Sequence, residues 1–270
     1  MLSSSVAQCL NSSVSKFISM TYKTSGIILK KQDWRDYDRL FTFYTKDFGK
    51  ISAVSRGVKK IKSKLAGNLQ ELAVIDLFII NGRRVDQLGG AVIDKNFLRI
   101  KANLDLINAT LSSLELVDQL TKEKLADPDI FSLLEDFLSA VNSINQPTGL
   151  KAVVLSQLFN FKFFDLLGYR PELYNCLECK NKISSGVNYF DYSGGVVCQN
   201  CQPQNLKLIS KEAIKILRFS LDHNLGDYLK VNINKNLDLE LISIIDNFMK
   251  FRLDKELKSR AYIMNLVMSH

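Results

Sequence analysis

The chain has 270 residues, of which 46% are hydrophobic and 24% charged, the balance of a globular protein large enough for two domains. No apolar run approaches the roughly 20 residues that a membrane-spanning helix needs, which argues against a membrane protein. The net charge of +8 is unevenly distributed. Residues 1–100 contain 17 Lys and Arg against 8 Asp and Glu, whereas residues 101–270 contain 19 against 20. Positive charge concentrated in the first third favours a polyanion-binding module there.

Residues 1–21 are rich in serine and contain one lysine and no acidic residue. They lack the apolar core of about 7–15 residues that a signal peptide requires, and they lack the arginines typical of transit peptides. We expect a disordered extension, or a start codon placed too early with Met20 as the functional start. Cys9 is then a free thiol.

Residues 22–100 are expected to form a small β-domain. Segments rich in β-branched and aromatic residues predict strands at 25–31, 38–45, 49–56, 72–80 and 85–93. Turns at 46–49 and 81–82 connect them, and Gly89-Gly90 predicts a bulge. Five short strands suit a closed barrel, and the OB-fold is the barrel of this size that binds single strands. An SH3-like barrel is the structural alternative that strand counting leaves open.

Residues 101–270 change to a helical period. Apolar spacing predicts helices at 103–125, 150–167, 210–221, 237–253 and 257–268. Asp127-Pro128 is an N-cap followed by proline, which predicts the start of another helix. The segment 150–167 contains four phenylalanines and is expected to be core. These patterns predict an α+β multidomain fold class, with a five-stranded barrel of the OB-fold or SH3-like type followed by an α-helical domain.

Four of the five cysteines form the pattern C-x2-C, eighteen residues, C-x2-C, at Cys176, Cys179, Cys198 and Cys201. Two such pairs supply the four thiolates of a tetrahedral structural zinc site, one zinc per chain, inserted at residues 174–203. A closed site leaves no position for water and therefore no Lewis-acid role. The alternative is a dithiol redox pair. The residues between the pairs resemble the small hairpin of a zinc ribbon.

A basic segment lies between two of the predicted strands. No acidic residue occurs between Asp47 and Glu71, and the interval contains Lys50, Arg56, Lys59, Lys60, Lys62 and Lys64. Unpaired positive charge on a loop favours nucleic acid binding, although composition alone gives equal weight to a solvated surface. Other candidates for the same surface are Lys30, Trp34, Arg35, Arg39, Arg83 and Arg84. Trp34 is expected either to stack on a base or to plug the end of the barrel.

Catalytic side chains are few. The two histidines and the absence of a G-x4-G-K-[ST] loop argue against triad chemistry and ATP hydrolysis. Asp33, Asp36 and Asp38 leave a metal-dependent nuclease as a minor alternative, but their interleaving with basic and aromatic residues favours a loop of ion pairs. We therefore expect a protein that is not an enzyme.

In combination and order, several segments of the chain resemble the RecO family of bacterial recombination mediators. The resemblance extends from about residue 25 to the C-terminus. Its segments are 26–30, 38–45, 48–50, 53–60, 167–173, the two C-x2-C pairs and 252–260. Residues 1–21 lie outside the family pattern.

The resemblance implies an OB-fold, a helical domain and a zinc-ribbon-like insertion. It also implies binding to single- and double-stranded DNA, annealing of complementary strands, and partnership with RecR, sometimes RecF, and the C-terminal tail of single-stranded-DNA-binding protein, so that RecA can load. The implied location is the bacterial cytoplasm, in association with the nucleoid. The family's DNA-facing residues match best at Arg56, Lys59, Lys60, Lys62 and Lys64. A zinc-ribbon RNA-binding or transcription factor is the competing class.

Overall fold

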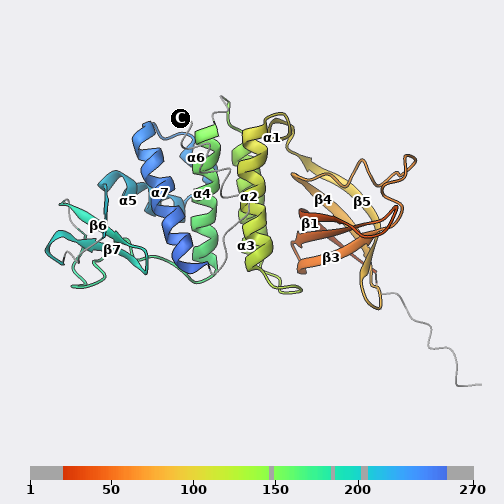
Figure 1. Cartoon of the computed structure of the whole chain (residues 1–270), viewed down its shortest axis with the longest axis horizontal. Helices are drawn as coiled ribbons and strands as arrows, with labels where there is room; N and C mark the ends of the chain where they lie inside the picture. The colour runs from red at the N-terminus through yellow and green to blue at the C-terminus, as the bar shows by residue number, and fades with distance from the viewer. Residues whose placement is uncertain (1–20, 146–148, 184–185, 202–205, 254–270) are drawn as a thin grey trace, which may run out of the picture.

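The computed structural model describes residues 21–145, 149–183, 186–201 and 206–253. The molecule is elongated, with a β-barrel at one end, a layer of helices in the middle and a small hairpin at the other end (Figure 1). The predictions for residues 1–20, Cys9 and the helix at 257–268 lie outside the described residues. Among the described helices, none combines the length and apolarity that crossing a bilayer demands.

Five strands form the N-terminal sheet, as predicted, and they close into a barrel in the order β1-β2-β3-β5-β4. Their bounds are β1 (Thr21–Asp33), β2 (Arg39–Thr45), β3 (Gly49–Ser55), β4 (Ala73–Ile80) and β5 (Asp86–Asn96). All neighbours are antiparallel except β3 and β5, which pair in parallel at Ala53 and Val54. The register of β5 against β4 shifts at Gly89, which confirms the predicted bulge. β1 is longer than predicted and begins at Thr21, inside the expected extension.

Both faces of several barrel strands are buried, which explains their nearly continuous apolar sequences. Ile28, Phe43 and Ile75 belong to the cluster that fills the barrel. Ile27 and Val74 point the other way and belong to the cluster formed mainly by the helices. The barrel and the helical part therefore share one continuous apolar boundary.

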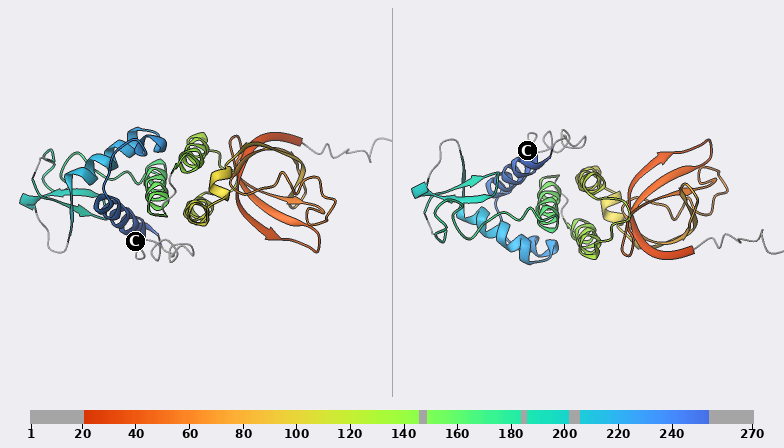
Figure 2. Two further views of the ribbon diagram at one scale, coloured as in Figure 1. Left: turned by 90° about the horizontal axis from the view of Figure 1, so that it is seen from above. Right: turned by 90° about the horizontal axis from the view of Figure 1, so that it is seen from below.

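The helical part surrounds one central helix. α4 (Gly149–Leu166) is buried on nearly all sides, and its four phenylalanines belong to the core, as predicted. Figure 2 shows α2 and α3 between α4 and the barrel, and α5 and α7 on the other side. The remaining elements are α1 (Leu98–Lys101), α2 (Leu104–Leu120), α3 (Pro128–Asn142), β6 (Asn188–Asp191), β7 (Gly195–Cys198), the 3-10 turn η1 (Gln199–Cys201), β8 (Lys207–Ile209), α5 (Lys211–Asp222), α6 (Leu225–Tyr228) and α7 (Lys235–Arg252).

Side-chain caps fix where the longer helices begin. The Asp127 carboxylate accepts from the backbone amides of Asp129 and Ile130, as the Asp-Pro pattern predicts. Asn103, Ser210 and Asn234 cap α2, α5 and α7 in the same way. The sequence prediction missed α1, α6 and β8, which are three or four residues long and too short to show a period.

Polar contacts join the barrel to the last turn of α2 and to the loop that follows it. Lys50 Nζ donates to the carbonyl oxygen of Asp118 at 2.6 Å, and the amide of Lys124 donates to the carbonyl of Lys50 at 2.8 Å. Gly49 has a φ of +65°, and a Cβ there would lie 2.0 Å from the carbonyl oxygen of Leu125. Lys50, which the sequence placed in the basic segment, is therefore committed to this junction.

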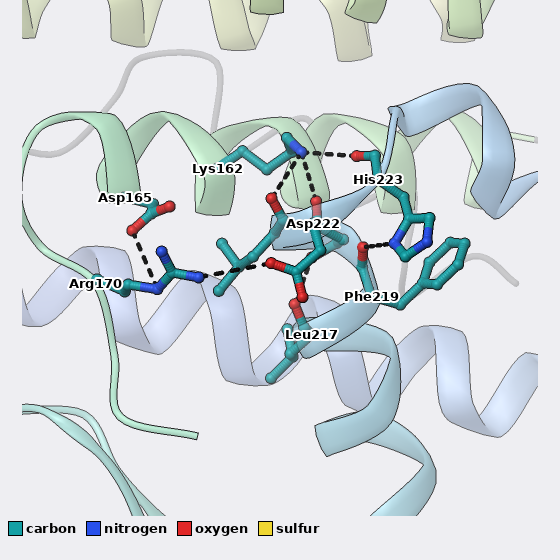
Figure 3. A network of polar contacts seen from close by, with 9 residues as sticks. Lys162, Asp165, Arg170, Leu217, Phe219, Asp222 and His223 are labelled. Carbon is teal, nitrogen blue, oxygen red and sulfur yellow. Dashed lines mark hydrogen bonds and ion pairs between the residues drawn. The ribbon is translucent and has the colours of Figure 1, made fainter. Parts of the chain in front are cut away.

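A second polar network ties α4 to the end of α5 (Figure 3). Lys162 Nζ donates to the carbonyl oxygens of Ser220 and His223, both at 2.7 Å, and to that of Leu221 at 3.3 Å. Burial lowers the pKa of Lys162. Because all three ammonium hydrogens have carbonyl partners, this lysine caps a helix end and is not a candidate catalytic base.

Candidate nucleic-acid interface and metal centre

The basic segment Arg56–Lys64 follows β3 and is tied to the loop at residues 34–38. The amide of Lys59 donates to the carbonyl of Tyr37 at 3.1 Å, and the amide of Gly57 donates to Asp38 Oδ1 at 2.8 Å. Lys59 Nζ also lies 3.3 Å from the carbonyl oxygen of Arg35. These contacts make the two loops one surface at the end of the barrel where β1 meets β2.

Asp33 holds two of the predicted DNA-binding cations. Its carboxylate lies 3.1 Å from Arg39 Nε and 3.0 Å from Lys59 Nζ. Hydrogen bonds from Lys59 and then Arg39 keep the pKa of Asp33 below its ordinary value. The expectation of unpaired charge is thus wrong for Lys59, because its partner Asp33 is distant in sequence and was not visible in the basic run. Asp33, Arg39 and Lys59 are called the loop clamp below.

The other cations of the segment are exposed. Arg56, Lys60, Lys62 and Lys64 lie on the surface. Among the described residues, no carboxylate lies within ion-pairing distance of any of these four. Lys60 Nζ instead lies 5.2 Å from the centre of the Tyr37 ring. Four cations without acidic neighbours are therefore available to an anionic ligand.

Trp34 lies in the loop beside this segment. Its side chain is 47% exposed and does not belong to the buried cluster inside the barrel, so the expectation of a barrel plug is wrong. Arg35, from the same loop, is also exposed. Tyr37, which the sequence prediction did not select, is 57% exposed. Only its position between Trp34 and Arg39 could have indicated it.

The remaining candidate cations lie elsewhere on the barrel. Lys30 is exposed on β1 and adjoins a register shift between β1 and β2. Arg83 and Arg84 lie between β4 and β5, at the end of β1 that pairs with Ile80. The basic segment lies at the opposite end of β1, where Asp33 pairs with Arg39. The structure therefore does not bring the two arginines together with the basic segment.

The three aspartates near β2 do not converge. Asp33 belongs to the loop clamp, and Asp38 accepts a backbone hydrogen bond from Gly57. Within the described ranges, the one group of three or more His, Cys, Asp and Glu placed to hold a metal consists of the four cysteines. This geometry gives no support to a nuclease site at Asp33, Asp36 and Asp38.

The four predicted metal ligands converge at the far end of the molecule. The Sγ atoms of Cys176, Cys179, Cys198 and Cys201 all lie within 4.8 Å of one another, with 3.8 Å between Cys179 and Cys198. A tetrahedral zinc with Zn–S bonds of about 2.3 Å would place its sulfurs about 3.8 Å apart. The hairpin of β6 and β7, which the sequence predicted, brings Cys198 beside the amino-terminal pair.

Hydrogen bonding and crowding in this cluster both fit a bound cation. Burial opposes ionisation of Cys176, but backbone amides, first that of Cys198, outweigh it and lower its pKa to about 6. The pKa of Cys201 is raised to about 12, first by its hydrogen bond with Cys179 and then by burial and the other thiols. The crowding of the four sulfurs therefore disfavours four thiolates unless a positive ion neutralises them.

Two arginines fasten the segment at residues 173–201, called the metal segment below, to the helices. Arg218 of α5 donates to the carbonyl oxygen of Leu173, at 3.1 Å from Nε. Arg252 of α7 donates to the carbonyls of Tyr192 at 2.6 Å and Ser193 at 2.9 Å. The segment that carries the cysteines is therefore held against both α5 and α7.

Both halves of the chain match models of a known protein family. Residues 20–97 match the family model described as Recombination protein O N terminal, and residues 103–261 match Recombination protein O C terminal. The chain belongs to the RecO family. A DNA repair protein RecO of Dehalococcoides mccartyi is 30% identical over 91% of this chain and 96% of its own length. The RecO proteins of Desulforamulus reducens and Caldanaerobacter subterraneus are 25% and 26% identical, over 92% and 90% of this chain.

Membership of the RecO family confirms the resemblance inferred from the sequence motifs. The two family models divide the chain at the transition from β5 to α1, where the barrel ends and the helices begin. In this RecO-family chain the exposed basic segment lies within the N-terminal match, and all four cysteines lie within the C-terminal match.

Proposed function

We propose that this RecO-family protein is a DNA repair and recombination mediator that binds single- and double-stranded DNA and anneals complementary strands. The observation that supports this best is the exposed set Arg56, Lys60, Lys62 and Lys64, held on the barrel with no described carboxylate at ion-pairing distance. The closed five-stranded barrel supports this proposal, because the OB-fold is a barrel of this size that binds nucleic acids in other proteins. The names of the relatives support a role in DNA repair.

The mechanism requires no bond chemistry, and we propose that the protein is not an enzyme. Two complementary strands repel each other through their phosphates. A surface that neutralises phosphates lowers this repulsion and holds both strands close, while base pairing supplies the driving force. Affinity for the backbone alone is independent of sequence, as annealing of any pair of strands requires.

We further propose that the cysteines hold one structural zinc per chain in a zinc-ribbon-like insertion. Four thiolates complete the coordination of zinc, so the metal contributes folding energy and no chemistry. Thiolates that remain reduced fit the cytoplasm, and we propose that DNA binding keeps the protein in association with the bacterial nucleoid.

The partners that we propose are those that the family resemblance implies for a recombination mediator. RecR, in some bacteria also RecF, and the C-terminal tail of single-stranded-DNA-binding protein would bind the chain, so that RecA loads onto coated strands. The helical part offers the surface for protein partners, because its net charge is −1 and it does not compete for DNA.

The test is a timed annealing assay on complementary strands coated with single-stranded-DNA-binding protein, with and without magnesium and ATP. We expect faster annealing that requires neither. Magnesium-dependent strand cleavage would favour a nuclease instead. Stronger binding to RNA than to DNA of equal length would favour a zinc-ribbon RNA-binding or transcription factor.

A further inference from the structure

Three large apolar side chains are exposed together on the loops at the end of the barrel. Trp34 is 47% exposed, Tyr37 is 57% exposed, and Ile61 is fully exposed. Single exposed apolar residues are common on protein surfaces, whereas a group of them on neighbouring loops indicates a binding surface. None of the three belongs to the buried cluster that fills the barrel.

Backbone hydrogen bonds join the two loops that carry these side chains. The amide of Trp34 donates to the carbonyl of Asp38 at 3.2 Å, which closes the loop at residues 34–38. The amide of Lys59 donates to the carbonyl of Tyr37, so the basic segment starts directly beside the tyrosine. The loop clamp joins the same two loops through Asp33. A surface ordered before binding loses little conformational entropy when a ligand arrives.

Tyr37 is also held by a cation. Lys60 Nζ lies 5.2 Å from the ring centre, within the range of a cation–π contact, yet more than half of the side chain remains accessible. The ring is therefore oriented by Lys60 while still able to contact a ligand. Lys60 is a positioning residue for Tyr37 as well as a charge.

The ligand that fits such a surface combines flat apolar groups with negative charge. Aromatic rings beside unpaired cations match the bases and phosphates of a single strand, because every base offers a face for stacking. In a duplex the same faces are stacked inside the helix and cannot reach a protein ring. Charge alone does not distinguish the two forms, so the aromatic side chains are the discriminating element.

We propose that Trp34 and Tyr37 stack on unpaired bases of single-stranded DNA, with Ile61 extending the apolar surface, and thereby favour single strands over duplex. The proposal rests on the proposed function and names the residues that distinguish the two DNA forms. Arg35 and Lys62 flank this aromatic surface in the sequence and contact the phosphates.

The single tryptophan of the chain makes stacking directly observable. Titrating wild-type protein with a thymidine oligonucleotide should quench the fluorescence of Trp34. A hairpin duplex with the same number of phosphates should bind without comparable quenching. This measurement needs no variant and does not depend on any substitution folding correctly.

Variants separate stacking from charge. Tyr37→Ala should weaken single-strand binding roughly 5- to 140-fold, the range for loss of one base–aromatic stack. Its salt slope and duplex affinity should be unchanged, and Tyr37→Phe should restore binding. The matched control is Tyr174→Ala, since Tyr174 is also a half-exposed tyrosine with a cation over its ring, here Arg218, but lies in the metal segment. Thermal melts establish that each variant folds.

The outcomes distinguish this proposal from the proposed function. Equal quenching by single strand and duplex, or unchanged single-strand affinity of folded Tyr37→Ala, would overturn base stacking while leaving DNA binding intact. Absence of salt-dependent binding to either form would instead overturn the proposed function.

Discussion

Asp33 determines which cations of the surface are available. The basic sequence predicted that Lys59, like its neighbours, is unpaired and can bind a phosphate. In the structure its ammonium lies 3.0 Å from the Asp33 carboxylate. Lys60, Lys62 and Lys64 are exposed and have no such partner among the described carboxylates. Lys59 therefore orders the loops, and the other lysines are the better candidates for phosphate contact.

The loop clamp predicts a low titration midpoint for Asp33. Lys59 and Arg39 favour its ionised form, so its pKa in the folded protein lies below the ordinary 3.8. With a depressed pKa, the stabilisation by the clamp is complete above pH 3.8 and is lost as the pH falls through the folded-state pKa. Carboxyl-carbon NMR should show this low midpoint. Lys59→Ala should raise it and Lys62→Ala should not, whereas a wild-type midpoint at or above 3.8 would contradict the clamp.

At the scale of elements, we expect the fold of the metal segment to depend on a bound zinc ion, which the chain itself does not supply. Protein purified under reducing conditions without chelator should contain about one zinc per chain. Cys179→Ser should lower that content and the melting temperature, because metal binding at such sites is coupled to folding. Cys9→Ser is the matched control and should change neither. Elemental analysis that finds no zinc in the wild type would contradict the assignment.

Local patterns predicted most elements and the metal ligands. The five strands followed from β-branched and aromatic runs, and the start of α3 followed from Asp127-Pro128. The four cysteines could be assigned to one metal site because each C-x2-C pair is a local pattern, visible in the sequence itself. What the sequence could not show is the partner of Lys59 or the role of Lys50, because both contacts join residues distant in the chain. The element ends were imprecise for the same reason, since β1 is extended to Thr21 by pairing with β4.

At the scale of the whole molecule, the barrel and the helices should unfold together. They share buried residues, and Gly49 packs directly against the backbone of Leu125. Gly49→Ala would place a Cβ 2.0 Å from the Leu125 carbonyl oxygen at a φ of +65°. We expect a loss of roughly 1–3 kcal/mol in the free energy of unfolding, from steric overlap and backbone strain.

The control for this change is Gly67→Ala, since no atom lies within 4 Å of a Cβ at that position. Denaturant unfolding followed separately by Trp34 fluorescence and by far-ultraviolet circular dichroism should give one coincident transition for both variants. Two separate transitions in the wild type, or equal stability of the two variants, would show that the junction does not couple the barrel to the helices.

The most direct test of DNA binding by the barrel uses the uneven charge of the chain. The barrel variant replaces three exposed lysines by Ala: Lys60, Lys62 and Lys64. The helical variant replaces three exposed lysines of the helical part by Ala: Lys182, Lys211 and Lys215. The slope of log affinity against log salt for a single strand is about −0.7 per phosphate contact, so the barrel variant should flatten it by up to about 2. The helical variant should leave it nearly unchanged, and both should melt like the wild type. Equal slopes in the two folded variants would contradict DNA binding through this surface.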